Sequence, residues 1–234
     1  MEQALAFARG PLFIATFSLM ALGLMRLVFI ELTEMSRAWS GMRDRNIPWS
    51  QNLKAFINWM VPVKMIPRMR PVFSAVSFLF HLGLIIVPIF LAEHIRLWER
   101  GLGISWPAIG RGLADFLTLL TMTACLVLLA IRVFHRPTRA LSGFWDYALL
   151  VIIFVPFASG YAMVHPQWLF TSFSAMMLIH VLSAELVFVL MPFTKLSHVV
   201  LFPFSRVSSD FYWRFPADGP DRVAQALHGE NVKA

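Results

Sequence analysis

Apolar residues gather into five long runs in this chain, and shorter polar segments separate them. The runs cover residues 11–32, 72–97, 111–134, 144–164 and 168–193. A helix needs about 20 apolar residues to cross the ~30 Å hydrocarbon core of a bilayer, and every run reaches that length. The pattern therefore predicts an all-α membrane protein that folds as a bundle of five transmembrane helices.

Little of the chain lies outside these runs, so no separate soluble domain is expected. We predict one membrane domain over residues 1–210 and a cytoplasmic tail over residues 211–234. The segment before the first run, Met1–Gly10, holds Glu2 and one basic residue, Arg9, and no small-residue cleavage site follows the run. A cleaved signal peptide has a basic start and such a site, so we expect the first run to remain in the membrane.

The composition supports a membrane class and excludes several kinds of site. Hydrophobic residues make up 58% of the chain and charged residues 14%, far from the balance of globular domains. The single cysteine, Cys125, excludes a disulfide framework and any cysteine-ligated iron–sulfur or zinc site within the chain, and we interpret it as a small packing residue. No nucleotide or flavin fingerprint and no nucleophile–base motif is present.

The chain has a net charge of +7, and its basic residues are spread unevenly over the connections between the runs. Lysine and arginine gather in the 33–71 connection, in the connection between the third and fourth runs, and after the fifth run, whereas the other connections carry few charges. Cytoplasmic loops carry the basic excess in membrane proteins. We therefore expect the N-terminus outside and the C-terminus in the cytoplasm of a bacterial inner membrane, and no nucleic-acid partner.

Three of the histidines in or beside the apolar runs stand out, because polar groups are costly there. His81 lies in the second run, and His180 and His198 are 18 residues apart along the fifth. Ionisable residues within a membrane are functional candidates by default. On one continuous helix, 18 residues make five turns, which would place both rings on one face, ~27 Å apart in depth. Two imidazoles at two depths suit two haems, one near each side of the bilayer.

The residues around these histidines resemble a known family. The chain has Phe78-Leu-Phe-His-Leu-Gly83 on the second run, and Pro192-Phe-Thr-Lys-Leu-Ser-His198 at the end of the fifth. These stretches are similar to those of the gamma, or cytochrome b, subunit of respiratory nitrate reductases. The resemblance extends to the cytochrome b subunits that join heterodisulfide-reductase-like iron–sulfur proteins in sulfate reducers, and it covers most of the chain.

The resemblance implies a set of axial haem ligands. His81 and His198 correspond to the pair on the haem nearer the cytoplasm, and His180 to one ligand of the haem nearer the outside. The family has its second histidine of this span ten residues after the first, where this chain has Leu91, which cannot ligate iron.

His94 is the nearest candidate for the missing outer ligand. It lies thirteen residues after His81, which is ~220° around a straight helix, so we expect a bend near Pro88 that turns its ring inward. His165, at the outer end of the fourth run, is the alternative ligand. Each of these histidines could instead be an ordinary hydrogen-bonded or solvated residue, and we interpret His135 and His228 in that way.

Two charged residues lie deep within the runs. Arg26 and Glu185 both fall at ~22–26 Å from the predicted outer surface. Charges buried in lipid usually pair, so an ion pair between them is expected, with a role for Arg26 at a haem propionate as the alternative.

The ligand set favours electron transfer over substrate chemistry, because iron with two histidine ligands has no open position. The resemblance implies oxidation of menaquinol or ubiquinol near the outer haem, with electrons passing to an iron–sulfur subunit, or the reverse. At the quinone site it points to Arg111, with Arg100 and His94 as competitors. The other hypotheses are a haem-free anchor for a soluble redox enzyme, and a cytochrome b whose acceptor is a multihaem cytochrome c.

Overall fold

The computed structural model describes residues 1–41, 50, 53–54, 57, 71–204, 225 and 227. All regular structure in these ranges is helical. Five helical stretches are long and apolar enough to cross a membrane, and they span Glu2–Ser40, Pro71–Phe90, Arg111–Phe134, Phe144–Val164 and Phe173–Phe193. The prediction of an all-α, multi-pass membrane protein is confirmed at this level.

The chain divides into two compact units. The first comprises Met1–Phe17 and Ile66–Phe188, and the second comprises Ser18–Met65 and Val189–Ala234. The boundary that the sequence predicts between residues 210 and 211 lies outside the described residues and stays a prediction.

Most of the described helices belong to the first unit. They are α1 (Glu2–Phe7), the π-helical turn Ala8–Leu12, the start of α2 (Phe13–Gly41), α4 (Pro71–Phe90), α5 (Ala92–Leu102), α6 (Arg111–Phe134), α7 (Arg136–Ala140), α8 (Phe144–Val164), the 3-10 turn Pro166–Trp168 and most of α9 (Phe173–Leu190). The rest of α2 and the 3-10 turns Met191–Phe193 and Lys195–Ser197 belong to the second unit.

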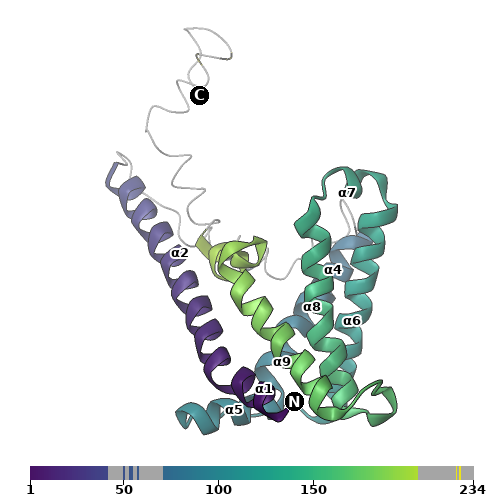
Figure 1. The fold of residues 1–234 in the computed structure, drawn as a ribbon. Coiled ribbons are helices and arrows are strands. Elements are labelled where there is room, and N and C mark those ends of the chain that lie inside the picture. The colour runs from purple at the N-terminus through teal and green to yellow at the C-terminus, as the bar shows by residue number, and fades with distance from the viewer. Residues whose placement is uncertain are drawn as a thin grey trace. The chain divides into compact units, whose positions relative to one another are not determined.

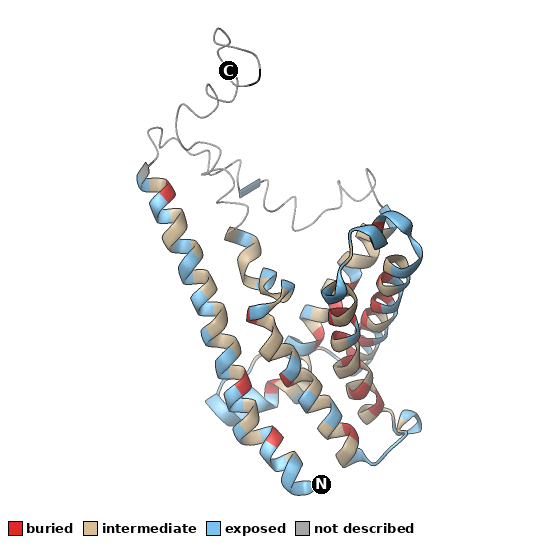
Figure 2. Cartoon of the chain, turned by 45° about the horizontal axis from the view of Figure 1, so that its top comes forward, coloured by how far each residue is buried: buried red, intermediate tan, exposed pale blue. Residues whose placement is uncertain are grey.

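The core of the first unit lies where α6 packs between α4 and α8 (Figure 1). Its buried residues recur every three or four positions along α6 and are mostly small, which lets helix backbones approach closely in a membrane. Figure 2 shows the buried positions concentrated on these helices. Cys125 is one of them, and its Sγ donates to the Leu150 carbonyl of α8 at 3.2 Å. The prediction that it is a small packing residue is confirmed.

Gly83 lies where α4 and α6 approach each other closely. A Cβ added there would overlap the Thr121 side chain and lie 2.9 Å from the Leu117 carbonyl oxygen. Because that oxygen belongs to the helix backbone, it cannot move aside cheaply. We expect Gly83→Ala to lower the free energy of unfolding by ~1–3 kcal/mol, measured by thermal unfolding in detergent. Gly112→Ala is the matched control, since a Cβ there meets nothing within 4 Å, and equal melting temperatures for the two variants would contradict this packing.

Two helices end earlier than the sequence predicts. The second apolar run was expected to continue to residue 97, but α4 ends at Phe90 and a separate, strongly amphipathic helix, α5, follows.

In the fifth run α9 begins at Phe173 and ends at Leu190. Pro192 lacks the N–H that would continue the helix, and Thr194 is extended, with φ −126° and ψ −175°. The prediction that His180 and His198 share one face of a continuous helix is therefore wrong, and the ~27 Å separation does not follow from it.

Candidate haem site

The junction between α4 and α5 fixes the place of His94. Leu91 is extended there, with φ −71° and ψ 130°, so the last carbonyls of α4 lose their partners within the helix. Other groups replace them. The Pro88 carbonyl accepts from His94 Nδ1 at 3.0 Å, that of Ile89 from Trp106 Nε1 at 2.9 Å, and that of Phe90 from the Ile109 N–H at 3.0 Å. The expected bend is present, three residues beyond Pro88, and the imidazole of His94 caps the end of the helix.

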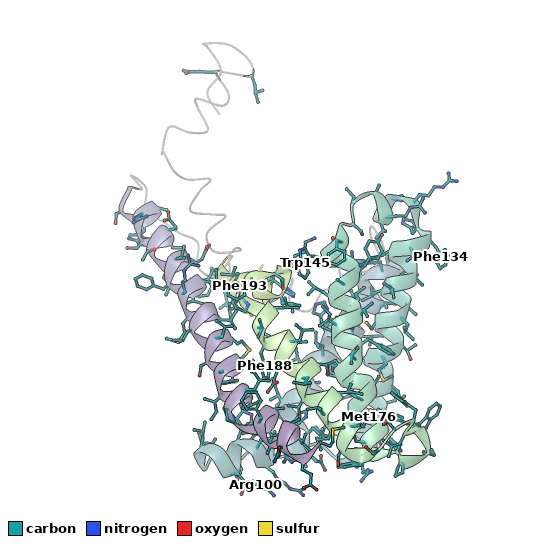
Figure 3. The ribbon with its side chains drawn as sticks, in the orientation of Figure 1. Arg100, Phe134, Trp145, Met176, Phe188 and Phe193 are labelled. Atoms are coloured by element: carbon teal, nitrogen blue, oxygen red, sulfur yellow. The ribbon has the colours of Figure 1, made fainter. Side chains whose placement is uncertain are left out.

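An aromatic cluster brings α5 close to α9. Phe17 contacts Trp98 of α5, with ring centroids 5.6 Å apart, and Phe188 of α9, at 6.0 Å. Phe13 adds a further contact with Phe188, and Trp106 lies beside Trp98. Figure 3 shows Phe188 on α9 and Arg100 on α5. The cluster explains how a histidine after the second span can approach one on the fifth.

His94 and His180 face each other across this contact. Their ring centroids are 6.1 Å apart, and their planes differ by 19°. Two imidazoles that bind one metal ion from opposite sides, through bonds of ~2 Å, have centroids roughly 6 Å apart. The pair therefore has the centroid spacing expected of two imidazoles on one iron, and the ring that lies beside His180 is that of His94.

Backbone carbonyls hold both rings of this pair. His180 Nδ1 lies 2.9 Å from the Pro156 carbonyl oxygen of α8, with Ser159 Oγ at 3.3 Å, while His94 Nδ1 is bound to Pro88. A ring nitrogen that donates to a carbonyl carries the proton, which leaves the lone pair on Nε2. Among the residues that the structure describes, neither Nε2 has a hydrogen-bond partner. Such outer contacts fix tautomer and orientation in metal-binding histidines.

Gly160 makes room for the His180 ring. A Cβ at this position of α8 would lie 3.1 Å from His180 Cε1 and 3.3 Å from Nδ1. Any side chain other than hydrogen would press on the imidazole, so the ring's place on α9 depends on this glycine of α8.

The protonation state of His94 also suits a ligand. It lies outside the membrane-spanning helices, and burial lowers its pKa below the usual value, although the hydrogen bond to Pro88 and the charge of Glu93 oppose the change. A neutral imidazole is the form that binds a metal.

In the other two predicted ligands, Nδ1 also lies beside a backbone carbonyl oxygen. His81 Nδ1 lies 2.7 Å from the Ser77 carbonyl oxygen, and His198 Nδ1 lies 2.6 Å from that of Lys195. His135 differs, because its Nδ1 contacts Thr138 Oγ1 at 2.9 Å. Since His81 belongs to the first unit and His198 to the second, their pairing on one haem stays a prediction.

The predicted alternative ligand, His165, contacts a carboxylate. Its Nε2 lies 3.3 Å from Asp115 Oδ2, and its ring lies 4.2 Å from that of Tyr161 between centroids. Nearby, Arg111 Nη2 donates to the Val164 carbonyl oxygen at 3.1 Å. The sequence interpretation did not single out Asp115, although a carboxylate five residues into an apolar run was a signal that could have found it.

Glu185 is the other buried ionisable group. It is 3% exposed, and neither carboxylate oxygen has a hydrogen-bond partner among the residues described. Its expected partner, Arg26, belongs to the second unit, so the ion pair stays a prediction.

The described residues contain no group of three or more His, Cys, Asp or Glu side chains that could hold a metal ion. A haem needs only two protein ligands on its iron, so the His94–His180 pair remains a candidate for holding one. Fold and site thus define a helical, multi-pass membrane protein with a facing pair of histidines.

Comparison with known proteins places the chain in a family. It is 35% identical, over 156 residues, to a protein of Nitratidesulfovibrio vulgaris (strain Hildenborough) whose name, "Protein", carries no function. The match covers 66% of this chain and 67% of the relative, and the two proteins belong to one family. No family model matches the chain, and no solved structure matches it.

Proposed function

We propose that this chain is a dihaem b-type cytochrome that anchors a respiratory complex in the membrane and transfers electrons between a quinone and an iron–sulfur partner subunit. The observation that carries the proposal is the His94–His180 pair, with centroids 6.1 Å apart and each Nδ1 bound to a backbone carbonyl. The resemblance to the nitrate reductase cytochrome b subunits supports it through the motifs around His81 and His198.

When bound, haem supplies one-electron redox chemistry, and with two imidazoles on its iron it offers no open position to oxygen or substrate. The residues of the chain bind and orient it. His94 and His180 would hold the outer haem, and His81 and His198 would hold the inner haem. The Pro88 and Pro156 carbonyls keep the outer rings in the tautomer that ligates through Nε2, and Gly160 leaves space for the His180 ring.

The proposed orientation places the N-terminus outside and the C-terminus in the cytoplasm of a bacterial inner membrane. The basic connections between spans support it. In this orientation the junction of α4 and α5 and the first turn of α6 lie at the outer surface, so a quinone that binds near Arg111 would meet the outer haem. The named relative comes from a sulfate reducer, in keeping with the resemblance to the cytochrome b subunits of such organisms.

Reduction by a quinol tests this function. We expect a short-tailed naphthoquinol, added to the oxidised protein in detergent, to produce the α band of a reduced b-type haem, with dithionite defining full reduction. A haem-free anchor would show no α band with either reductant. A cytochrome that dithionite reduces but the naphthoquinol does not would contradict the link to quinones.

A further inference from the structure

The pair formed by Asp115 and His165 has no part in holding haem in the proposed function. Asp115 lies in the second turn of α6, and His165 directly follows the last residue of α8. The two side chains come from different helices and approach to 3.3 Å at the same end of the first unit. A carboxylate next to an imidazole is a frequent arrangement in groups that accept and pass on protons.

The two side chains approach each other closely without forming a full hydrogen bond. His165 Nε2 is buried, and its contact with Asp115 is too poorly aligned to be a full hydrogen bond. A buried ring nitrogen without a full bond requires an explanation. The side chains are 22% and 30% exposed, which is enough for a proton to leave to water.

The surroundings suit a flat, polar headgroup. The Tyr161 ring lies against the imidazole at 4.2 Å. The Arg111 guanidinium, one turn before Asp115 on α6, lies at the C-terminal end of α8 and donates to the Val164 carbonyl. Asp115, Arg111 and Tyr161 are thus the charged and titratable groups around His165 on α6 and α8, and the turn Pro166–Trp168 adds none.

The pair also lies close to the proposed outer haem. Gly160 of α8 touches the His180 ring, and His165 is five residues further along, which is ~7.5 Å of helical rise. The two positions are therefore close in depth and lie ~140° apart around α8.

We propose that Asp115 and His165 form the proton acceptor for quinol oxidation, an inference that rests on the proposed function. The Nδ1 lone pair of His165 takes the proton of a quinol O–H group, and the Asp115 carboxylate, whose Oδ2 lies 3.3 Å from Nε2, stabilises the imidazolium that results. Each quinol loses two protons and two electrons and becomes a quinone. The two electrons would be taken up one at a time by the bound haems, and the protons pass through the partly exposed pair to water.

The test compares His165→Gln and Asp115→Asn with the wild type in the haem-loaded protein. His135→Gln is the matched control, because that histidine is bound to Thr138 beyond the opposite end of α6. We expect both site variants to keep the dithionite-reduced spectrum. Their maximal rate of reduction by naphthoquinol should fall ~100-fold or more with little change in KM. His135→Gln should behave as the wild type.

A second readout does not depend on turnover. In infrared difference spectra recorded as quinol reduces the protein under single-turnover conditions, the wild type should show bands of a protonating imidazole, and His165→Gln should lack them. Wild-type rates in both site variants would overturn the inference and leave the proposed function intact. A wild type that naphthoquinol cannot reduce would instead overturn the proposed function. If His165→Gln fails to fold, Asp115→Asn alone decides, because it keeps the imidazole.

Discussion

Replacing His180 with alanine should remove the outer haem and leave the inner one. An imidazole ligand is lost while His81 and His198 stay in place, so haem content should fall by about half, as should the α-band absorbance. His94→Ala should give the same result, because the two rings share one site at 6.1 Å. Haem extraction and the reduced-minus-oxidised spectrum of the purified variants provide the measurement.

His165→Ala is the control that separates the two candidates for the outer ligand. Its Nε2 lies beside Asp115, so this variant should keep its full haem content. The assignment of His94 would be contradicted if His165→Ala lost the outer haem and His94→Ala kept it.

A larger residue at Gly160 should also reduce binding of the outer haem, as His180→Ala should, although it removes no ligand. Since a Cβ there already comes within 3.1 Å of His180 Cε1, Gly160→Leu should displace the ring. Disturbing the surroundings of a metal ligand typically weakens metal binding 10–100-fold. We expect Gly160→Leu to lose most of its outer haem and Gly160→Ala to lose part of it, as measured by titrating haem into the apoprotein.

The helix itself should tolerate these changes, because alanine and leucine form helices better than glycine does. Loss of haem from a variant that still unfolds cooperatively therefore points to the ring and not to the fold. Gly101→Leu in α5 is the matched control, since a Cβ there meets nothing within 4 Å. Equal haem affinity in Gly101→Leu and Gly160→Leu would contradict the role of Gly160.

The five membrane-length helices could be predicted because each is a local pattern: an apolar run of sufficient length requires no knowledge of its neighbours. Their ends could not be predicted as well. The end of α4 at Phe90 depends on Trp106 and Ile109, which supply hydrogen bonds from a later loop. The end of α9 was signalled by Pro192, but the 18-residue spacing of the histidines favoured a continuous helix.

The sequence could predict which residues belong to the candidate site, but it could not predict the contacts that those residues make. Sequence motifs indicated His180, and the failure of the family pattern at Leu91 led to His94. What orients the His180 ring lies elsewhere in the chain: the Pro156 carbonyl and Gly160 are on α8, and they approach His180 only after the helices pack. The contact between Asp115 and His165 likewise forms between residues of two different helices. The spacing of residues along the sequence does not predict a contact of this kind.

The haem content of the purified chain tests the central claim most directly. A pyridine haemochrome assay, set against protein concentration, should give two b-type haems per 26.7 kDa chain. A protein that folds in the membrane and contains no haem would contradict the claim and favour an anchor subunit. A single haem that survives His180→Ala would contradict the outer half of the site.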